Sequence, residues 1–142
     1  MSAIKVGDGG PDFVVGPLTR TDIVRYAGAS GDFNPIHHDE EFARSAGLPS
    51  VMAHGMLSAG LLASFVTHWF GAGSVRRFKV RFRERVWPGD MLRAEGRVTA
   101  LVAGADGPRA QLEISLNRAD GKPVITGSAE VLLGQEGTGD KG

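Results

Sequence analysis

Apolar and polar residues alternate over residues 77–86, with apolar side chains on one face and charged side chains on the other. This period of two predicts a β-strand with one buried face, and Glu84 alone interrupts the apolar set. Turn sequences rich in Gly, Pro and Asp separate three further predicted strands, which cover residues 91–102, 110–117 and 123–133. Four strands joined by short connections predict an antiparallel meander.

The segment 55–70 predicts a helix that is apolar in nearly every direction. No Asp, Glu, Lys or Arg occurs between Arg44 and Arg76, so the helix has no charged face to turn toward water. A helix of this kind is buried on all sides. Because one sheet covers only one side of a helix, we expect a second protein chain to cover the other side, and therefore a dimer.

The first part of the chain predicts two shorter helices. Thr19 followed by Asp22 is typical of a capping box at the start of a helix over residues 20–29. Asp39 is placed to cap a second, shorter helix. Helices first and antiparallel strands afterwards indicate an α+β fold, with a curved antiparallel sheet wrapped around the long hydrophobic helix.

Length and composition are those of one globular domain. The chain has 142 residues, 42% hydrophobic and 23% charged; we place the domain at residues 1–134 and a flexible, Gly-rich tail at 135–142. Lys and Arg number 16, as do Asp and Glu, and this balance argues against a nucleic-acid-binding protein. The absence of cysteine excludes disulfides and thiolate chemistry and favours a cytoplasmic location. The longest apolar run is too short to span a membrane, so we expect no membrane association.

Candidate acid–base chemistry centres on Asp32 and His37, which are separated by a loop that the pair Asn34-Pro35 bends. A bent loop can bring both side chains to one point, where a carboxylate and an imidazole can act on a shared water molecule. The alternative interpretation is structural, because Asp is common in turns and a loop histidine can simply be hydrogen-bonded in place. The spacing by itself leaves both interpretations open.

Gly55 is the second candidate, because it opens the apolar helix within the sequence Ala-His-Gly-Met at residues 53–56. The first N–H groups of a helix have no acceptor within the helix and lie at the positive end of its dipole. Glycine has no Cβ, so a ligand can approach this backbone closely and a developing oxyanion would be stabilised there. Alternatively, Gly55 only lets the helix start tightly against the sheet.

Together these features resemble the MaoC-like family, also known as the (R)-specific enoyl-CoA hydratase or hydratase 2 family. The first shared motif is Tyr-Ala-x-x-Ser-Gly-Asp-x-Asn-Pro-Ile-His-x-Asp at residues 26–39, and the second is Ala-His-Gly-Met at 53–56. Val-Arg-Phe at 80–82, Pro-Gly-Asp at 88–90 and Asp-Gly-Lys at 120–122 fit the same pattern. The chain is also similar to the small β-type subunit of the mycobacterial (3R)-hydroxyacyl-ACP dehydratases, which belong to this family.

The resemblance implies a hot-dog fold and reversible hydration of trans-2-enoyl thioesters to (3R)-hydroxyacyl thioesters, with acyl-CoA or acyl-ACP as substrate. It implies that Asp32 and His37 are the catalytic pair and that the N–H of Gly55 is the oxyanion-hole donor. Asn34 would help to hold the pair and its water. The reaction requires no metal or redox cofactor, and the enzyme would be a homodimer or a heterodimer with a related hot-dog subunit. Three further residues are expected to contact the substrate: Met56, Phe82 and Arg81.

Other functions fit parts of the sequence. A metal site could be built from four residues: His37, His38, Asp39 and His54; a His-Glu-x-x-His motif is absent. Ser30 lacks the Gly-x-Ser-x-Gly sequence of serine hydrolases, but hot-dog proteins include thioesterases, so thioester hydrolysis is an alternative. The chain could also be a non-catalytic or partner-dependent subunit of a hetero-oligomeric acyl-ACP dehydratase, although the presence of both catalytic residue types argues against a purely structural role.

One row of basic residues occupies alternate positions of the first predicted long strand: Arg77, Lys79, Arg81, Arg83 and Arg85. Such a row is usually a solvent-exposed sheet face. The functional alternative is contact with the phosphates of coenzyme A or with an acidic acyl carrier protein.

Overall fold

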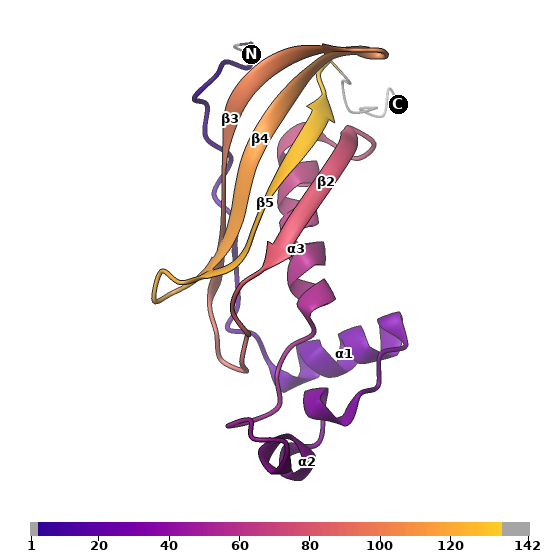
Figure 1. The fold of residues 1–142 in the computed structure, drawn as a ribbon, viewed down its shortest axis with the longest axis vertical. Helices are drawn as coiled ribbons and strands as arrows, with labels where there is room; N and C mark the ends of the chain where they lie inside the picture. Colours follow the sequence, from indigo (N-terminus) through magenta and orange to yellow (C-terminus); the bar gives the residue numbers. More distant parts are fainter. Residues whose placement is uncertain (1–2, 135–142) are drawn as a thin grey trace, which may run out of the picture.

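The computed structural model describes residues 3–134, which form a five-stranded antiparallel sheet with one long helix along its face (Figure 1). The strands are β1 (Val14–Val15), β2 (Val75–Phe82), β3 (Leu92–Gly104), β4 (Gly107–Arg118) and β5 (Pro123–Leu132). The helices are α1 (Arg20–Ser30), the 3₁₀ helix η1 (Pro35–His37), α2 (Glu40–Ser45) and α3 (Gly55–Phe70). The α+β prediction is confirmed. The predicted tail at 135–142 lies outside the described residues, and the domain boundary stays a prediction.

The strand order differs from the predicted meander. Strands β3, β4 and β5 are consecutive neighbours, but β2 pairs with β5, which gives the order β1-β3-β4-β5-β2. Strand β2 also ends before the predicted residue 86, because the N–H groups of Arg83 and Glu84 both bond the carbonyl of Val124 and the regular register stops there. Alternation along a strand predicts which face is buried, but it does not predict which strand lies beside it.

Helix α3 supplies the centre of the core, where Leu62, Phe65 and Val66 are fully buried. Strand β3 passes close to the aromatic side chains of this helix at Gly96. A Cβ atom at that position would lie only 2.9 Å from Cε1 of Phe65 and 3.0 Å from Cζ3 of Trp69. The missing side chain at Gly96 is therefore what allows the sheet and the helix to approach this closely.

In the single chain, the sheet covers only one side of α3 (Figure 1). Met56 is 62% exposed, and Gly60, Ser64 and His68 are also exposed. These positions recur every four residues, so they form one stripe along the helix. An open side in the single chain agrees with the expectation that one sheet covers only one side of this helix, and burial of the other side by a second chain stays a prediction. No helix within residues 3–134 is long and apolar enough to cross a membrane.

We expect this open side of α3 to be covered by a second subunit, so that the purified protein has no stable monomer. Light scattering at micromolar concentration should show a dimer or a larger assembly, or aggregation if an unrelated partner subunit is missing. A monodisperse monomer would contradict this expectation.

The short helices gather beyond one end of the sheet, next to the start of α3 (Figure 1). Helix α1 begins with the predicted capping box: the Thr19 N–H donates to Asp22 Oδ2 at 2.8 Å, and the Asp22 N–H donates to Thr19 Oγ1 at 3.0 Å. The bond from the Thr19 backbone, aided by its hydroxyl, holds the pKa of Asp22 below its ordinary value. The helix ends at Gly31, whose φ of 76° turns the chain into the loop that carries Asp32.

Candidate active site

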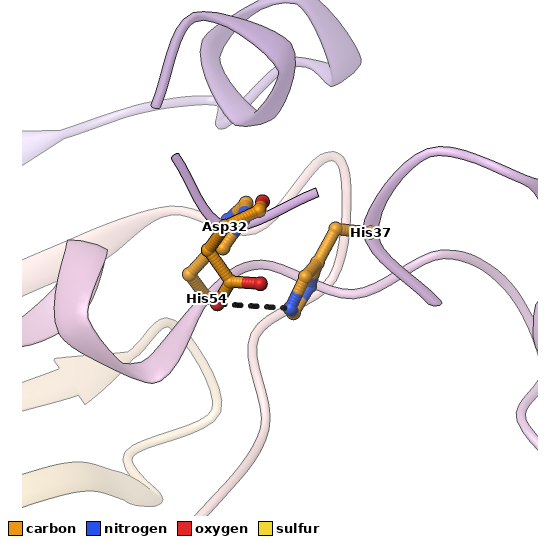
Figure 2. A group of neighbouring side chains, drawn as sticks. All are labelled: Asp32, His37 and His54. Atoms are coloured by element: carbon orange, nitrogen blue, oxygen red, sulfur yellow. Dashed lines mark hydrogen bonds and ion pairs between the residues drawn. The ribbon is translucent and has the colours of Figure 1, made fainter. Parts of the chain in front are cut away.

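Two successive turns bring Asp32 and His37 together. The N–H of Asn34 donates to Oδ1 of Asp32 at 3.3 Å, and the N–H of Ile36 donates to Oδ1 of Asn34 at 3.2 Å. In each turn a side chain accepts a hydrogen bond from the backbone two residues later, as is common for Asp and Asn in loops. The chain bends twice as a result, and η1 then presents the imidazole of His37 toward the Asp32 carboxylate (Figure 2).

His37 is held with one ring nitrogen facing Asp32. Its Nδ1 lies 2.7 Å from the carbonyl oxygen of Met52. Because a carbonyl oxygen only accepts, Nδ1 carries the hydrogen, and in the neutral ring Nε2 then has the lone pair. Nε2 lies 4.0 Å from Oδ2 of Asp32. This separation is too long for a direct hydrogen bond, but it allows one water molecule to contact both atoms.

A cavity of about 430 Å³ opens beside this pair. Its lining comes from α1, the loop after it, η1, the start of α3 and the end of β2: Tyr26, Ser30, Asp32, His37, His54, Gly55, Met56 and Phe82. Gly55 is the first residue of α3, so its N–H is one of the amides that have no acceptor within the helix. The ring of Phe82 lies against it, since a Cβ on Gly55 would be 3.1 Å from Cε1 of Phe82. A carboxylate, an imidazole and a helix N-terminus therefore share one apolar-walled space.

The other predicted site residues are divided between this cavity and its surroundings. Met56 and Phe82 line the cavity and are 62% and 52% exposed. Arg81 does not line it; this residue lies with Lys79 along a separate hollow of the sheet, because consecutive strand residues point to opposite faces. The side chain of Asn34 also lies outside the cavity lining and instead caps η1, the helix that carries His37.

His54 contacts both members of the pair, although the sequence motifs indicate no catalytic role for it. Its imidazole stacks on that of His37, with ring centroids 3.7 Å apart and an angle of 22° between the planes. Its Nε2 lies 3.0 Å from the backbone carbonyl oxygen of Asp32. The only sequence signal for a role of His54 was its place before Gly55 in the second motif. A motif does not reveal which side chains contact each other in the folded chain.

The donor atoms do not fit a metal site well. Atoms of Asp32, His37 and His54 lie within 4.8 Å of one another. However, the two imidazoles are stacked, so their in-plane lone pairs do not converge on one point, and Nε2 of His54 donates its hydrogen to a carbonyl. The other two residues of the predicted set have separate roles, because His38 Nε2 bonds a loop carbonyl and Asp39 caps α2.

Comparison with known proteins assigns the chain to a family. The MaoC-like domain family matches residues 8–113, which is most of the chain. The chain belongs to the MaoC-like family. The (R)-specific enoyl-CoA hydratase of Aeromonas caviae is 34% identical over 114 residues, covering 79% of this chain and 84% of that protein. The solved structure of the A. caviae (R)-hydratase involved in PHA biosynthesis has a TM-score of 0.81 at 29% identity, covering 94% of this chain and all of that chain. The predicted family and the hot-dog fold are thereby confirmed.

Much longer proteins are also similar to this chain. The mouse peroxisomal multifunctional enzyme type 2 is 36% identical over 97 residues, which is 66% of this chain. The chain spans only 13% of the length of that enzyme. A region similar to this chain therefore occurs both in a short hydratase and as one part of a much longer enzyme.

Proposed function

We propose that this chain is a hydro-lyase that reversibly adds water to trans-2-enoyl thioesters and forms (3R)-hydroxyacyl thioesters. The observation that carries the proposal is the Asp32–His37 pair beside a cavity that the N-terminus of α3 also reaches. The similarity to the A. caviae hydratase over most of both chains supports the same reaction.

The pair is arranged to hold the reacting water. Oδ2 of Asp32 and Nε2 of His37 both present lone pairs, so a water molecule between them donates one hydrogen to each and directs its own lone pair away from them. As the water oxygen bonds the β-carbon, one member of the pair accepts a proton from it. The pair then delivers a proton to the α-carbon, so that H and OH are both added and the pair returns to its starting state.

Gly55 supplies the third element of the proposed mechanism. Attack at the β-carbon moves electron density onto the thioester oxygen, and an N–H at a helix N-terminus stabilises negative charge at that point. The addition of water is redox-neutral, so we propose no redox cofactor. A second cavity of about 190 Å³ adjoins Gly55 and Phe82; Ala53, Val86 and Val124 form part of its lining, together with the charged residues Arg83, Glu84 and Arg85. We place the acyl chain along Phe82 toward the apolar part of this cavity.

The decisive experiment is an absorbance assay of the purified protein with crotonyl-CoA and with a long-chain enoyl-CoA, followed by chiral analysis of the product. We expect loss of the enoyl absorbance and formation of the (3R)-hydroxyacyl thioester. A parallel assay for free thiol detects hydrolysis. Thiol release without hydration would instead support a thioesterase.

We propose that the basic row contacts an acidic acyl carrier protein. Within residues 3–134, none of its five members forms an ion pair; they are Arg77, Lys79, Arg81, Arg83 and Arg85. Opposite Lys79 and Arg81, strand β5 presents the neutral residues Ser128 and Thr126, whereas opposite Arg77 it presents Glu130, which pairs with Arg109. The hollow along Lys79 and Arg81 is also lined by Glu95 and Glu113. A row of unpaired cations beside the strand end that carries Phe82 is suited to attract an acidic partner.

Replacing both Arg81 and Arg83 with Glu is therefore expected to lower kcat/KM for a carrier-bound enoyl substrate by about tenfold at low salt. The effect should shrink as salt is added, and CoA substrates should change less. Arg25→Glu is the matched control, because Arg25 is exposed on α1 away from the row. If kcat/KM falls equally with both substrates, or does not fall with either, the basic row is an ordinary solvent-exposed face and not a docking surface.

A further inference from the structure

We infer that His54 is a positioning residue that holds Asp32 and His37 in register with the start of α3. The inference rests on the proposed hydratase function, but the contacts that support it are those of this chain. His54 is the N-cap residue of α3, is only 2% exposed and directly precedes Gly55. Its side chain reaches both members of the acid–base pair (Figure 2).

The first contact fixes the backbone of Asp32. His54 Nε2 donates to the Asp32 carbonyl oxygen at 3.0 Å, across a large separation in sequence. The Asn34 N–H independently holds the carboxylate of Asp32 at 3.3 Å. Asp32 is exposed and lies in a loop, where backbone motion is least restrained by packing. The bond from the buried His54 ring therefore ties this loop residue to the rigid end of α3.

The second contact fixes the ring plane of His37. The bond from Nδ1 to the carbonyl of Met52 restrains one atom of that ring, but it permits rotation about the line of the bond. Stacking on His54 at 3.7 Å removes this freedom, so the lone pair of Nε2 stays aimed toward Asp32. His54 is itself packed against Tyr26, with ring centroids 4.8 Å apart.

Packing alone does not account for an imidazole at this position. His54 Nδ1 is buried and has no hydrogen-bond partner among residues 3–134. An unpartnered buried nitrogen is unfavourable, and an apolar ring of similar size would avoid it. An apolar ring would, however, lose the Nε2–H donor to Asp32. Histidine combines the donor and the stacking surface in a single five-membered ring.

The test separates the two contacts with two variants. His54→Phe keeps an aromatic ring for stacking and removes the donor, whereas His54→Gln keeps an N–H donor and removes the ring. His38→Gln is the matched control, because His38 also bonds a loop carbonyl, that of Phe33 at 3.2 Å, but does not line the cavity. Steady-state kinetics with an enoyl-CoA are combined with thermal melting and with ¹⁵N NMR of the His37 side chain.

We expect both His54 variants to lower kcat by about 10- to 100-fold, the scale of a small misplacement of catalytic groups, while KM changes much less. The His37 ¹⁵N signals should show a hydrogen mainly on Nδ1 in the unaltered protein and in His38→Gln. In His54→Gln the bond to Met52 still keeps the hydrogen on Nδ1, so we expect exchange broadening of the His37 signals as its ring gains rotation about that bond. General destabilisation of a still-folded protein would not cause this broadening.

Two outcomes would overturn the inference: unchanged kcat in both folded variants, or activity that falls only with the folded fraction while the His37 signals stay unchanged. If the unaltered protein hydrates no enoyl thioester, the proposed function fails instead. In that case the NMR comparison alone decides whether His54 positions the ring of His37.

Discussion

Replacing Asp32 with Asn, or His37 with Gln, is expected to lower the rate of enoyl-CoA hydration by about 10²-fold or more, as is usual for a general acid–base group. Asn keeps the shape of Asp but cannot accept a proton from water. Gln lacks the nitrogen lone pair that His37 directs toward the carboxylate at 4.0 Å. Initial rates at saturating substrate, measured from the loss of enoyl absorbance, would quantify both changes.

The same loop offers matched controls for these substitutions. Asp39→Asn changes a carboxylate that caps α2, a position where Asn is equally suitable, and His38→Gln changes the neighbouring exposed histidine. Both controls should keep nearly normal turnover. If Asp32→Asn or His37→Gln is folded and as active as these controls, the assignment of the pair is wrong.

Gly55→Val is expected to reduce turnover by about 10²-fold or more, the scale for loss of an oxyanion-hole donor. A side chain at residue 55 would stand between the first amide of α3 and the thioester oxygen. It would also press on Phe82, whose ring carbon Cε1 lies 3.1 Å from the position of the new Cβ. Because Phe82 is 52% exposed, its ring can turn away, and we expect the fold to survive.

Two further variants separate catalysis from packing at this position. Gly55→Ala should show a smaller loss of turnover of the same kind, because its methyl group blocks less of the amide. Gly28→Val on α1 is the control, since a Cβ at Gly28 would meet no atom within 4 Å. Turnover and thermal melting are measured together. Activity that falls only as far as stability falls would make Gly55 a packing residue.

Local patterns were sufficient wherever neighbours in the chain decide the structure. The capping box of Thr19 and Asp22, the cap at Asp39 and the helix beginning at Gly55 all depend on hydrogen bonds or side-chain periodicity within a few residues. The bend between Asp32 and His37 is of the same kind, because each turn joins residues two positions apart. These features could therefore be predicted from short stretches of sequence.

Tertiary structure decided whatever depends on residues far apart in the chain. The pairing of β2 with β5 is one example, because alternation specifies a strand's faces and not its neighbour. Alternation along β2 is enough to place Arg81 and Phe82 on opposite faces of the strand. That Phe82 lines the cavity and Arg81 does not depends on where β2 lies relative to α3.

By itself, the sequence determined the family motifs, the α+β class and the identity of Asp32, His37 and Gly55 as candidates, because these rest on residue type and short-range spacing. It did not reveal that His54 touches two of the site's components, since stacking at 3.7 Å on His37 and a bond to the Asp32 carbonyl require folding of the intervening chain. Only the folded chain brings Asp32, His37 and Gly55 to one cavity. Whether a histidine only packs or also orients its neighbours depends on contacts between residues that are far apart in the chain.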